Sequence, residues 1–460
     1  MKYISTRGQA PILDFEGAML SGLARDGGLY VPEQFPQISR DELLSLRGKP
    51  YADVAFAICK RYTEGSIPEE QLKSIIDLAY SSFDHPAITP LKQLAPNQYL
   101  LELFHGPTLA FKDVAMQLLV HLMDWSLARN NRRFVIVGAT SGDTGGAAVE
   151  AFKNSNQTSL FILHPHGLVS DVQRKQMTTV NSPDIHNIAI EGNFDDCQAI
   201  VKALFNDLKF RDDVGLAGVN SINWARIMAQ IVYYFYAALQ LGAPDRAVSF
   251  TVPTGNFGNI FAGLAAKRMG LDIDRLVIAT NSNDILDRTL KTGSYTVTGV
   301  HATTSPSMDI QVSSNFERLV YLANKNDPAA VRSAMESLKQ SGAFTLQSEA
   351  IKSIRAEFDS SATSDADAAK TMANVLAETG ELLDPHTAVG YAIAQKISTS
   401  SPMVTLATAH PAKFPDAVEA ATKVRPNLPQ RLSHLMKATE TFKVLPNSEA
   451  AVKAFILSQR

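Results

Sequence analysis

From about residue 130 onward, the sequence repeatedly places a short apolar run before a polar, glycine-containing loop and then a helix-like segment. The stretch RFVIVGATSGDTGGAAVEAF has this order, and AVSFTVPTGNFGNIFAGLAAKRMG has it again further along the chain. Strands that alternate with helices form βαβ units, in which the strands run parallel. The pattern therefore predicts an α/β fold built on parallel sheets. Ligands of such sheets bind beyond the carboxyl ends of the strands, so the loops after the strands are the candidate sites.

Chain length and the position of these units suggest a division into several domains. The expected parts are a helix-rich N-terminal region over residues 1–95, a first α/β domain over 96–245, a second α/β domain over 246–430 and a C-terminal tail over 431–460. A domain of this kind can be built from more than one stretch of chain. Helices are expected around residues 316–357 and 366–397, and the intervening stretch 357–366 is expected to be a surface turn.

Bulk composition excludes several classes of protein. The formal net charge of -3 is unlike that of a nucleic-acid-binding protein, which is normally basic. The two cysteines, Cys59 and Cys197, form neither a disulfide framework nor a metal-site spacing, and they fit a reducing compartment. The longest uncharged stretch, Ile227–Pro244, is expected to be a buried helix rather than a membrane span. With no signal peptide recognisable, we expect a soluble cytoplasmic protein without a bound metal and without a nucleic-acid or membrane partner.

The loop GATSGDTGG, Gly138–Gly146, follows a predicted strand and opens a predicted helix. Its backbone N–H groups and hydroxyls could hold an anion at the helix N-terminus. The loop matches neither a Walker motif, which needs Gly-Lys-Ser/Thr, nor the GxGxxG of dinucleotide-binding folds. A tight strand–helix turn with an N-cap explains the same residues equally well.

A second loop, PTGNFGN at Pro253–Asn259, has the same position after a strand and before a helix. It offers backbone N–H groups but no lysine or arginine. That composition suits a phosphate dianion held by amides better than a transferring phosphoryl group, which needs cations. Thr408, in LATAHPAKFPD, ends a third predicted strand. Its hydroxyl could bond a ring nitrogen, or it could belong to a simple turn or cap.

Lys112 lies in ELFHGPTLAFKDVAMQLL, directly after Phe111 and at the start of a predicted amphipathic helix. The positive end of a helix dipole disfavours a cation, so Lys112 is either an ordinary surface lysine or an amine whose charge is unwanted. Desolvation beside Phe111 would lower its pKa and free it as a nucleophile. A lysine, a phosphate cup and a hydroxyl for a ring nitrogen together form the set of groups that binds pyridoxal 5'-phosphate.

Seven segments of the chain carry a resemblance to a known family. They are GLARDGGLYVP, ELFHGPTLAFKD, ATSGDTG, PTGNFGN, MDIQVSSNFERL, DPHTAVGY and TAHPAKF, in order from residue 22 to about residue 416. Together they resemble the threonine synthase family, in particular its longer branch from enteric-type bacteria and fungi. The resemblance implies two parallel-sheet α/β domains of the tryptophan-synthase-β type, with pyridoxal 5'-phosphate between them, and a helix-rich N-terminal region.

The resemblance also implies roles for individual residues. Lys112 would be the Schiff-base lysine and the base of the reaction, and Thr408 would face the pyridine nitrogen. The cofactor phosphate would be held by Gly255, Asn256, Phe257, Gly258 and Asn259, and the substrate carboxylate by the loop of Thr140, Ser141, Gly142, Asp143 and Thr144. Related dehydratases often show asparagine where this chain has Asp143. Candidates for the substrate phosphate, for which capping or solvated roles serve equally well, are Arg174, Lys175, Asn281, Ser282 and Asn283.

The implied reaction converts O-phospho-L-homoserine and water into L-threonine and phosphate by γ-elimination and β-addition of water, the last step of threonine biosynthesis. A pyridoxal-phosphate-dependent serine/threonine dehydratase is the alternative enzyme, and it would need no second anion site. A phosphate-ligand sensor on the same fold is the non-enzymatic alternative, but it would leave Lys112 without a purpose. No oligomeric state follows from the sequence.

Overall fold

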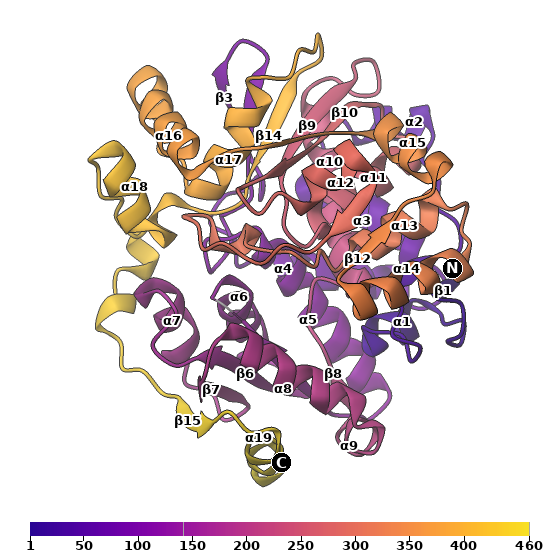
Figure 1. Cartoon of the computed structure of the whole chain (residues 1–460), viewed down its shortest axis with the longest axis vertical. Helices are drawn as coiled ribbons and strands as arrows, with labels where there is room; N and C mark the ends of the chain where they lie inside the picture. Colours follow the sequence, from indigo (N-terminus) through magenta and orange to yellow (C-terminus); the bar gives the residue numbers. More distant parts are fainter. Residues whose placement is uncertain (141, 460) are drawn as a thin grey trace.

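Two larger sheets, each covered by helices, form the framework of the molecule (Figure 1). The computed structural model describes residues 1–140 and 142–459. The five-stranded sheet has the order β15-β7-β6-β5-β8, and its neighbouring strands are parallel. Its strands are β5 (Phe134–Ala139), β6 (Thr158–Pro165), β7 (Ile185–Glu191), β8 (Leu216–Ala217) and β15 (Lys443–Pro446).

The six-stranded sheet has the order β13-β10-β9-β14-β4-β3, and within the described chain β3 is antiparallel to β4 while the other pairs are parallel. Its strands are β3 (Leu91–Ala95), β4 (Gln98–Glu102), β9 (Val248–Pro253), β10 (Ile273–Thr280), β13 (Phe358–Ala362) and β14 (Met403–Ala407). Every residue of β9 and β14 is buried, as expected for parallel strands that are covered by helices on both faces.

Helices cover both sheets. Around the five-stranded sheet lie α5 (Lys112–Arg129), α6 (Asp143–Phe152), α7 (Asp171–Thr178), α8 (Phe194–Asn206), α9 (Leu208–Val214) and α19 (Glu449–Ser458). The helices on the side of the six-stranded sheet are α10 (Trp224–Gln240), α11 (Gly258–Arg268), α12 (Ile285–Thr292), α16 (Asp365–Thr379), α17 (Pro385–Ala394) and α18 (Pro415–Thr422). Helix α10 is buried from Trp224 to Leu239. No helix of the described residues has both the length and the apolar character that crossing a bilayer requires.

The N-terminal region packs its helices against the two buried helices α5 and α10, with α3 on α10 and α4 on α5. Its elements are β1 (Tyr3–Ser5), α1 (Phe15–Ser21), β2 (Tyr30–Pro32), α2 (Arg40–Leu46), α3 (Tyr51–Thr63) and α4 (Glu69–Tyr80). The remaining elements are β11 (Ser294–Thr296), η1 (Pro306–Met308), α13 (Phe316–Ala323), α14 (Pro328–Ser341), β12 (Ala343–Thr345), α15 (Ser348–Glu357), η2 (Pro411–Lys413), η3 (Gln430–Leu432) and η4 (Leu435–Lys437), where η denotes a 3-10 turn.

The predicted α/β fold on parallel sheets, with a helix-rich N-terminal region, is confirmed. The surface turn predicted for residues 357–366 is wrong, because Phe358–Ala362 forms β13, which pairs in parallel with β10 at the edge of the sheet. Its serine-rich sequence lacks an apolar pattern since an edge strand is partly solvated, and Phe358 is its buried residue.

The division of the chain at residues 95, 245 and 430 stays a prediction. Strand β4, at the start of the predicted first α/β domain, lies in the six-stranded sheet, whereas β15, from the predicted tail, lies in the five-stranded sheet (Figure 1). Helix α19 packs on α8, and its residues Val452 and Ile456 join the core on that side of the sheet. The C-terminal residues are therefore part of the framework.

This packing gives a stability prediction. The Ile456 side chain is fully buried, so Ile456→Ala should lower the free energy of unfolding by about 2–4 kcal/mol through lost burial and a cavity. The neighbouring Leu457 is 51% exposed, and Leu457→Ala should change the same quantity by less than about 0.5 kcal/mol. Denaturant unfolding of both variants measures the difference; equal effects would show that α19 does not contribute to the core.

Candidate active site

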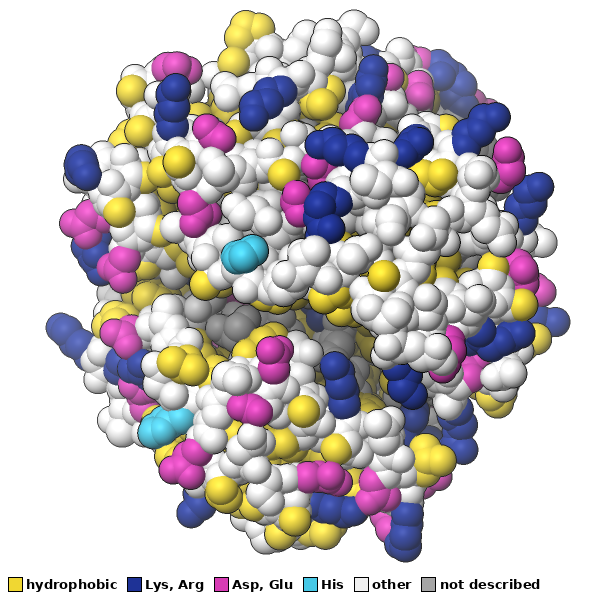
Figure 2. Space-filling view, viewed as in Figure 1, with side chains coloured by type: hydrophobic (Ala, Val, Ile, Leu, Met, Phe, Trp, Pro, Cys, Tyr) yellow, Lys and Arg dark blue, Asp and Glu magenta, His cyan; other side chains and the backbone are white. Residues whose placement is uncertain are grey.

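The loops that follow β5, β9 and β14 come together where the two larger sheets meet. Lys413 Nζ, after β14, lies 3.1 Å from Asp143 Oδ1, after β5. The Ser307 hydroxyl donates to Asp143 Oδ2 (2.9 Å). Ser307 also packs closely on Gly255, which follows β9: a Cβ added to Gly255 would lie 2.8 Å from the Ser307 carbonyl oxygen. Figure 2 shows a furrow across this face, between the part that carries α16–α18 and the part that carries α6–α8.

Lys112 is the first residue of α5, and the preceding Phe111 provides no side-chain cap. Its Nζ lies 3.6 Å from Asp143 Oδ2, and 13% of its side chain is exposed. Burial lowers the pKa of the Lys112 amine; Asp143 opposes this, and the positive charges of Lys413 and Arg226 reinforce it. Lys112 is therefore not a surface lysine, and its surroundings favour the neutral, nucleophilic amine.

Asp143 is the first residue of α6 and is buried. Its Oδ1 accepts a hydrogen bond from Gln173 Nε2 (2.9 Å) and forms an ion pair with Lys413 Nζ (3.1 Å), while Oδ2 accepts from the Ser307 hydroxyl (2.9 Å). The 3.6 Å separation from Lys112 Nζ is an ion-pair distance beyond hydrogen-bond range. Burial alone would raise the pKa of the Asp143 carboxyl, but the charges of Lys413 and Lys112 hold it well below its usual range.

Lys413 received no role from the sequence, although it lies in the segment TAHPAKF. Its side chain is fully buried. Besides Asp143, its Nζ donates to the Thr108 carbonyl (2.8 Å) and to Gln176 Oε1 (2.9 Å). Gln176 is held in this orientation because its Nε2 donates to the same Thr108 carbonyl (3.1 Å). No local pattern predicts a buried lysine in a 3-10 turn, since its partners come from segments far away in the sequence.

A buried relay fixes Ser307 from the other side. The backbone N–H of Ser307 donates to His386 Nε2 (3.2 Å), and His386 Nδ1 lies 2.8 Å from Asp384 Oδ1. Because a backbone N–H can only donate, Nε2 is the acceptor and the proton resides on Nδ1, which donates to Asp384. A neutral imidazole thus orients the serine whose hydroxyl contacts Asp143.

The predicted phosphate cup, Gly255–Asn259, forms the turn into α11, which begins at Gly258. Phe257 has φ 64°, a left-handed conformation that is strained for a phenylalanine. Such a residue next to a helix start lets successive N–H groups converge on an anion. No described residue accepts a hydrogen bond from the backbone N–H of Gly255, Asn256 or Phe257. These donors are open to a ligand.

Asn259 adds a side-chain donor to the cup. Its Oδ1 accepts hydrogen bonds from the hydroxyls of Tyr233 (2.5 Å) and Tyr234 (3.1 Å). This fixes the amide so that Nδ2 is buried without a partner among the described residues. A buried unpaired N–H donor is unfavourable, and an acceptor such as a phosphate oxygen would satisfy it.

The loop after β5 is held in place by Thr140 and by a required glycine. Thr140 Oγ1 accepts hydrogen bonds from the backbone N–H groups of Gly142 and Gly145, both at 2.9 Å. Gly142 has φ 148°, and a Cβ there would lie 2.5 Å from Gln173 Cδ. The tight turn therefore depends on glycine at this position.

This loop can receive a carboxylate through its backbone. No described residue accepts a hydrogen bond from the N–H of Asp143 or Thr144, the first two residues of α6. The Asp143 carboxylate itself is engaged and would repel another carboxylate, so its contribution to substrate binding would be its N–H group. Ser141, also predicted to bind substrate, lies outside the described residues.

Thr408 and Lys112 are brought together by a pairing of the segments that precede Lys112 and follow β14. The Phe111 N–H donates to the Thr408 carbonyl (2.9 Å), and the His410 N–H donates to the Leu109 carbonyl (3.0 Å). Thr408 is buried, and no described residue bonds its hydroxyl. The hydroxyl is therefore open to a ligand, and its contact with a ring nitrogen stays a prediction.

The turn Gly106-Pro107-Thr108, which precedes the segment paired with Thr408–His410, is held by Asp113 and by Arg431. The Asp113 carboxylate accepts from the N–H (2.8 Å) and the hydroxyl (2.6 Å) of Thr108, and burial raises its pKa to about 6 although these bonds oppose the rise. A Cβ on Gly106 would lie 2.4 Å from Asp113 Cβ. Arg431 donates to the carbonyls of Gly106 (2.8 Å) and Pro107 (3.0 Å).

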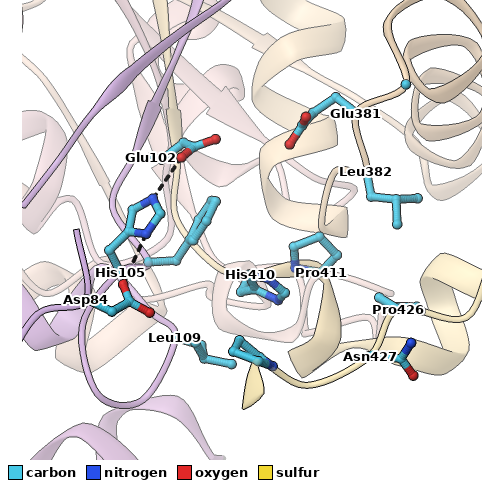
Figure 3. Close-up of a pocket in the computed structure, with 13 residues that line it drawn as sticks. Asp84, Glu102, His105, Leu109, Glu381, Leu382, His410, Pro411, Pro426 and Asn427 are labelled. Atoms are coloured by element: carbon cyan, nitrogen blue, oxygen red, sulfur yellow. Dashed lines mark hydrogen bonds and ion pairs between the residues drawn. The ribbon is translucent and has the colours of Figure 1, made fainter. Parts of the chain in front are cut away.

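A separate pocket of about 470 Å³ lies beside the same pairing (Figure 3). On one side His105 lies between Glu102 (2.7 Å) and Asp84 (3.2 Å). Burial and the neighbouring His105 lower the pKa of His410 to about 4, so this imidazole is neutral at physiological pH. Its Nδ1 accepts a backbone N–H of η2 (3.1 Å), and it thereby caps the turn that ends at Lys413.

Arg226, near the start of α10, is a second functional candidate that the sequence did not reveal. It is 2% exposed, its NH1 donates to the Val219 carbonyl (2.8 Å), and its Nε has no partner. No carboxylate of the described residues forms an ion pair with it. Burial lowers its pKa to about 10, which still leaves a cation at neutral pH. A buried guanidinium with a free donor requires an anion, but a single arginine beside an apolar run gives no sequence pattern.

Most residues predicted for a substrate phosphate are engaged in other contacts. Arg174 forms a bidentate ion pair with Glu440 (2.8 and 3.1 Å), and Lys175 donates to the Ala438 carbonyl (3.0 Å), so both anchor the C-terminal segment. Of the remaining candidates, Asn281 and Asn283 have side-chain amides that are bonded to Asp309, and Ser282 is exposed.

The described groups fit pyridoxal phosphate. A desolvated lysine amine, a glycine loop with open N–H groups, an orphaned amide on Asn259 and a free hydroxyl on Thr408 are the partners that its aldehyde, phosphate and ring nitrogen need. Each group lies at a strand end or a helix start and is fixed by neighbours, so little rearrangement is required to bind it.

Comparison with known protein families agrees with this chemistry. Residues 83–409 match the family model for pyridoxal-phosphate-dependent enzymes. Residues 2–80 match the model for the threonine synthase N terminus, and residues 387–456 match the C-terminal model of threonine synthase. The matches cover the helix-rich N-terminal region, both larger sheets and the C-terminal segment.

Individual relatives extend over the whole chain. A threonine synthase from Pseudomonas aeruginosa is 53% identical over 99% of this chain and 98% of its own length. The crystal structure of threonine synthase from Brucella melitensis with bound pyridoxal phosphate has a TM-score of 0.97 and 57% identity, covering 100% of this chain and 99% of that one. The yeast threonine synthase structure has a TM-score of 0.93 and 40% identity, covering 100% and 98%. The chain belongs to the threonine synthase family of pyridoxal-phosphate-dependent enzymes.

Proposed function

We propose that the chain converts O-phospho-L-homoserine and water into L-threonine and phosphate. The observation that carries this proposal is the buried Lys112 amine, which shares a site with the open N–H groups of Gly255–Phe257, the free hydroxyl of Thr408 and an unpaired cation, Arg226. A nucleophilic amine, a cofactor cup and demand for a further anion match a phosphorylated amino-acid substrate. Family membership supports the same reaction.

The residues that would hold pyridoxal phosphate are Lys112 through its amine, Gly255–Asn259 through backbone N–H groups and the Asn259 amide, and Thr408 through its hydroxyl. When bound, the cofactor supplies an electron sink that makes protons on the α and β carbons of an amino acid removable. A hydroxyl partner, unlike a carboxylate, leaves the ring nitrogen largely unprotonated, which suits elimination and replacement at the β and γ carbons.

The remaining groups bind and orient the substrate. The substrate carboxylate would accept hydrogen bonds from the N–H groups of Asp143 and Thr144 at the start of α6, and the Thr144 side chain would contribute to the same loop, for which Ser141 stays a predicted residue. Lys112 would then take the α proton and a proton from the β carbon, and protons would be returned to the γ and α carbons, which needs an amine whose pKa lies near the working pH. Loss of phosphate from the γ carbon and addition of water at the β carbon complete the balance.

Arg226 would bind the substrate phosphate for two reasons. Its charge is close enough to lower the pKa of Lys112, and no carboxylate of the described residues forms an ion pair with it. This observation also separates the proposal from a serine/threonine dehydratase, which shares the cofactor but needs no second anion site. The decisive assay supplies O-phospho-L-homoserine and measures phosphate and threonine together. Equal release of both supports the proposal, whereas 2-oxobutyrate made from threonine as the main activity would contradict it.

The cellular setting and the domain division belong to the same proposal. The two free, buried cysteines, Cys59 and Cys197, support a cytoplasmic location. The parts 1–95, 96–245, 246–430 and 431–460 are proposed as units of the chain. Two strands pair outside their own part: β4, from the first α/β part, belongs to the six-stranded sheet, and β15, from the tail, belongs to the five-stranded sheet.

The attachment site is testable directly. Borohydride reduction of the cofactor-loaded protein, followed by peptide mapping, should place the pyridoxyl adduct on Lys112. Lys112→Ala should remove the adduct and lower kcat by about 100- to 10,000-fold, because the covalent anchor and the base are lost together. Lys175→Ala, a lysine bonded to the C-terminal segment, should keep both. An adduct on another lysine would overturn the assignment.

The role of Arg226 predicts a change in substrate affinity. Arg226→Gln should raise KM for O-phospho-L-homoserine by about 30-fold, since a hydrogen bond to a charged group contributes about 2 kcal/mol. The affinity for pyridoxal phosphate should stay unchanged. The control is Arg425→Gln, which removes an arginine whose exposed guanidinium pairs with Asp416 and Glu419. A loss of cofactor affinity at constant KM would instead assign Arg226 to the cofactor phosphate.

A further inference from the structure

We propose that Lys413 is a positioning residue that secures the negative charge of Asp143 and thereby keeps the Lys112 amine available for reaction. The inference rests on the proposed role of Lys112. Within the described chain, the polar contacts of Lys413 Nζ are with Asp143, Thr108 and Gln176, and not with the phosphate cup or the open N–H groups of the substrate loop. Its effect on the reaction would therefore pass through Asp143 and Lys112.

Lys413 must carry a full ammonium charge. Its Nζ donates to the Thr108 carbonyl at 2.8 Å and to Gln176 Oε1 at 2.9 Å, and it forms an ion pair with Asp143 Oδ1 at 3.1 Å. The orientation of Gln176 is settled by its own bond to Thr108, so its oxygen does face Lys413. A neutral amine has two N–H donors, which these two bonds would use, and its lone pair would then be left beside the Asp143 carboxylate, an arrangement that an ammonium avoids.

Asp143 is shared unequally between the two lysines. Lys413 lies within hydrogen-bond range of Oδ1, whereas Lys112 lies 3.6 Å from Oδ2, an oxygen that already accepts from the Ser307 hydroxyl. One carboxylate can neutralise one of the two ammonium groups. The geometry gives that charge to Lys413, which leaves Lys112 with the weaker contact.

Among the described residues, no other group neutralises the positive charge around Lys112. The charged groups that face it are Asp143 from α6, Lys413 from η2 and Arg226 from α10. On its own helix, Asp113 is turned to Thr108. Two cations, Lys413 and Arg226, lie near Lys112, and the one anion, Asp143, is already paired with Lys413. Protonation of the buried Lys112 amine is therefore disfavoured by charge as well as by desolvation.

The test uses the full-length protein freed of cofactor, and it measures the rate at which pyridoxal phosphate is captured, by its absorbance change, as a function of pH. The rate follows the fraction of neutral Lys112, so the midpoint of the pH profile reports its protonation. Lys413→Met should raise the midpoint by about 1 unit or more, because Asp143 becomes free to pair with Lys112. Asp143→Asn should lower it by a similar amount, and this arm does not depend on the folding of the Lys413 variant.

Matched controls separate charge from packing. Lys413→Arg keeps the charge and should keep the midpoint near that of the unmodified chain, and Lys175→Met removes a lysine of the neighbouring helix α7 and should leave it unchanged. Shifts of opposite sign for Lys413→Met and Asp143→Asn support the inference. Unchanged midpoints, or shifts of the same sign, overturn it. If the Lys112→Ala protein captures the cofactor covalently as fast as the unmodified chain, the proposed role of Lys112 fails instead.

Discussion

The buried carboxylate of Asp143 is the contact on which the rest of the site depends. It lies at the start of α6 and is reached by Lys112 from α5, Lys413 from η2, Gln173 from α7 and Ser307 from the segment beside the phosphate cup. Through it the five-stranded sheet is tied to the loops of the six-stranded sheet. A charge taken out of water needs several strong partners to be tolerated, and these partners fix the position of the reactive amine at the same time.

The charges of the site are incomplete without ligands. Lys413 and Arg226 bring positive charge to the buried surroundings of Lys112, and Asp143 is the carboxylate that faces the two lysines. The open N–H groups of the cup and of the start of α6 add positive potential. A cofactor phosphate, a substrate carboxylate and a substrate phosphate would supply the missing negative charge. The same excess that disfavours the Lys112 ammonium therefore also favours binding of anionic ligands.

The sequence predicted what is encoded locally, and it missed what is assembled by packing. Strand–loop–helix patterns placed the loops Gly138–Gly146 and Pro253–Asn259 at strand ends, and the break before α5 placed Lys112 at a helix start. Lys413 and Arg226 could not be found in this way, because their importance comes from burial and from partners far away in the chain. The edge strand β13 was missed for a related reason: its pairing with β10, and not an apolar pattern of its own, makes it a strand.

One carboxylate thus serves two lysines unequally: Asp143 lies 3.1 Å from Lys413 Nζ and 3.6 Å from Lys112 Nζ, and protonation of Lys112 is disfavoured. The most direct measurement is an NMR titration of the full-length protein labelled with 13C in the lysine side chains, with signals assigned by Lys112→Arg and Lys413→Arg. The Lys112 signal should titrate at clearly lower pH than that of a free lysine, because burial and the nearby cations disfavour its ammonium form. A Lys112 signal that titrates at the pH of a free lysine, or above it, would contradict this assignment of charge.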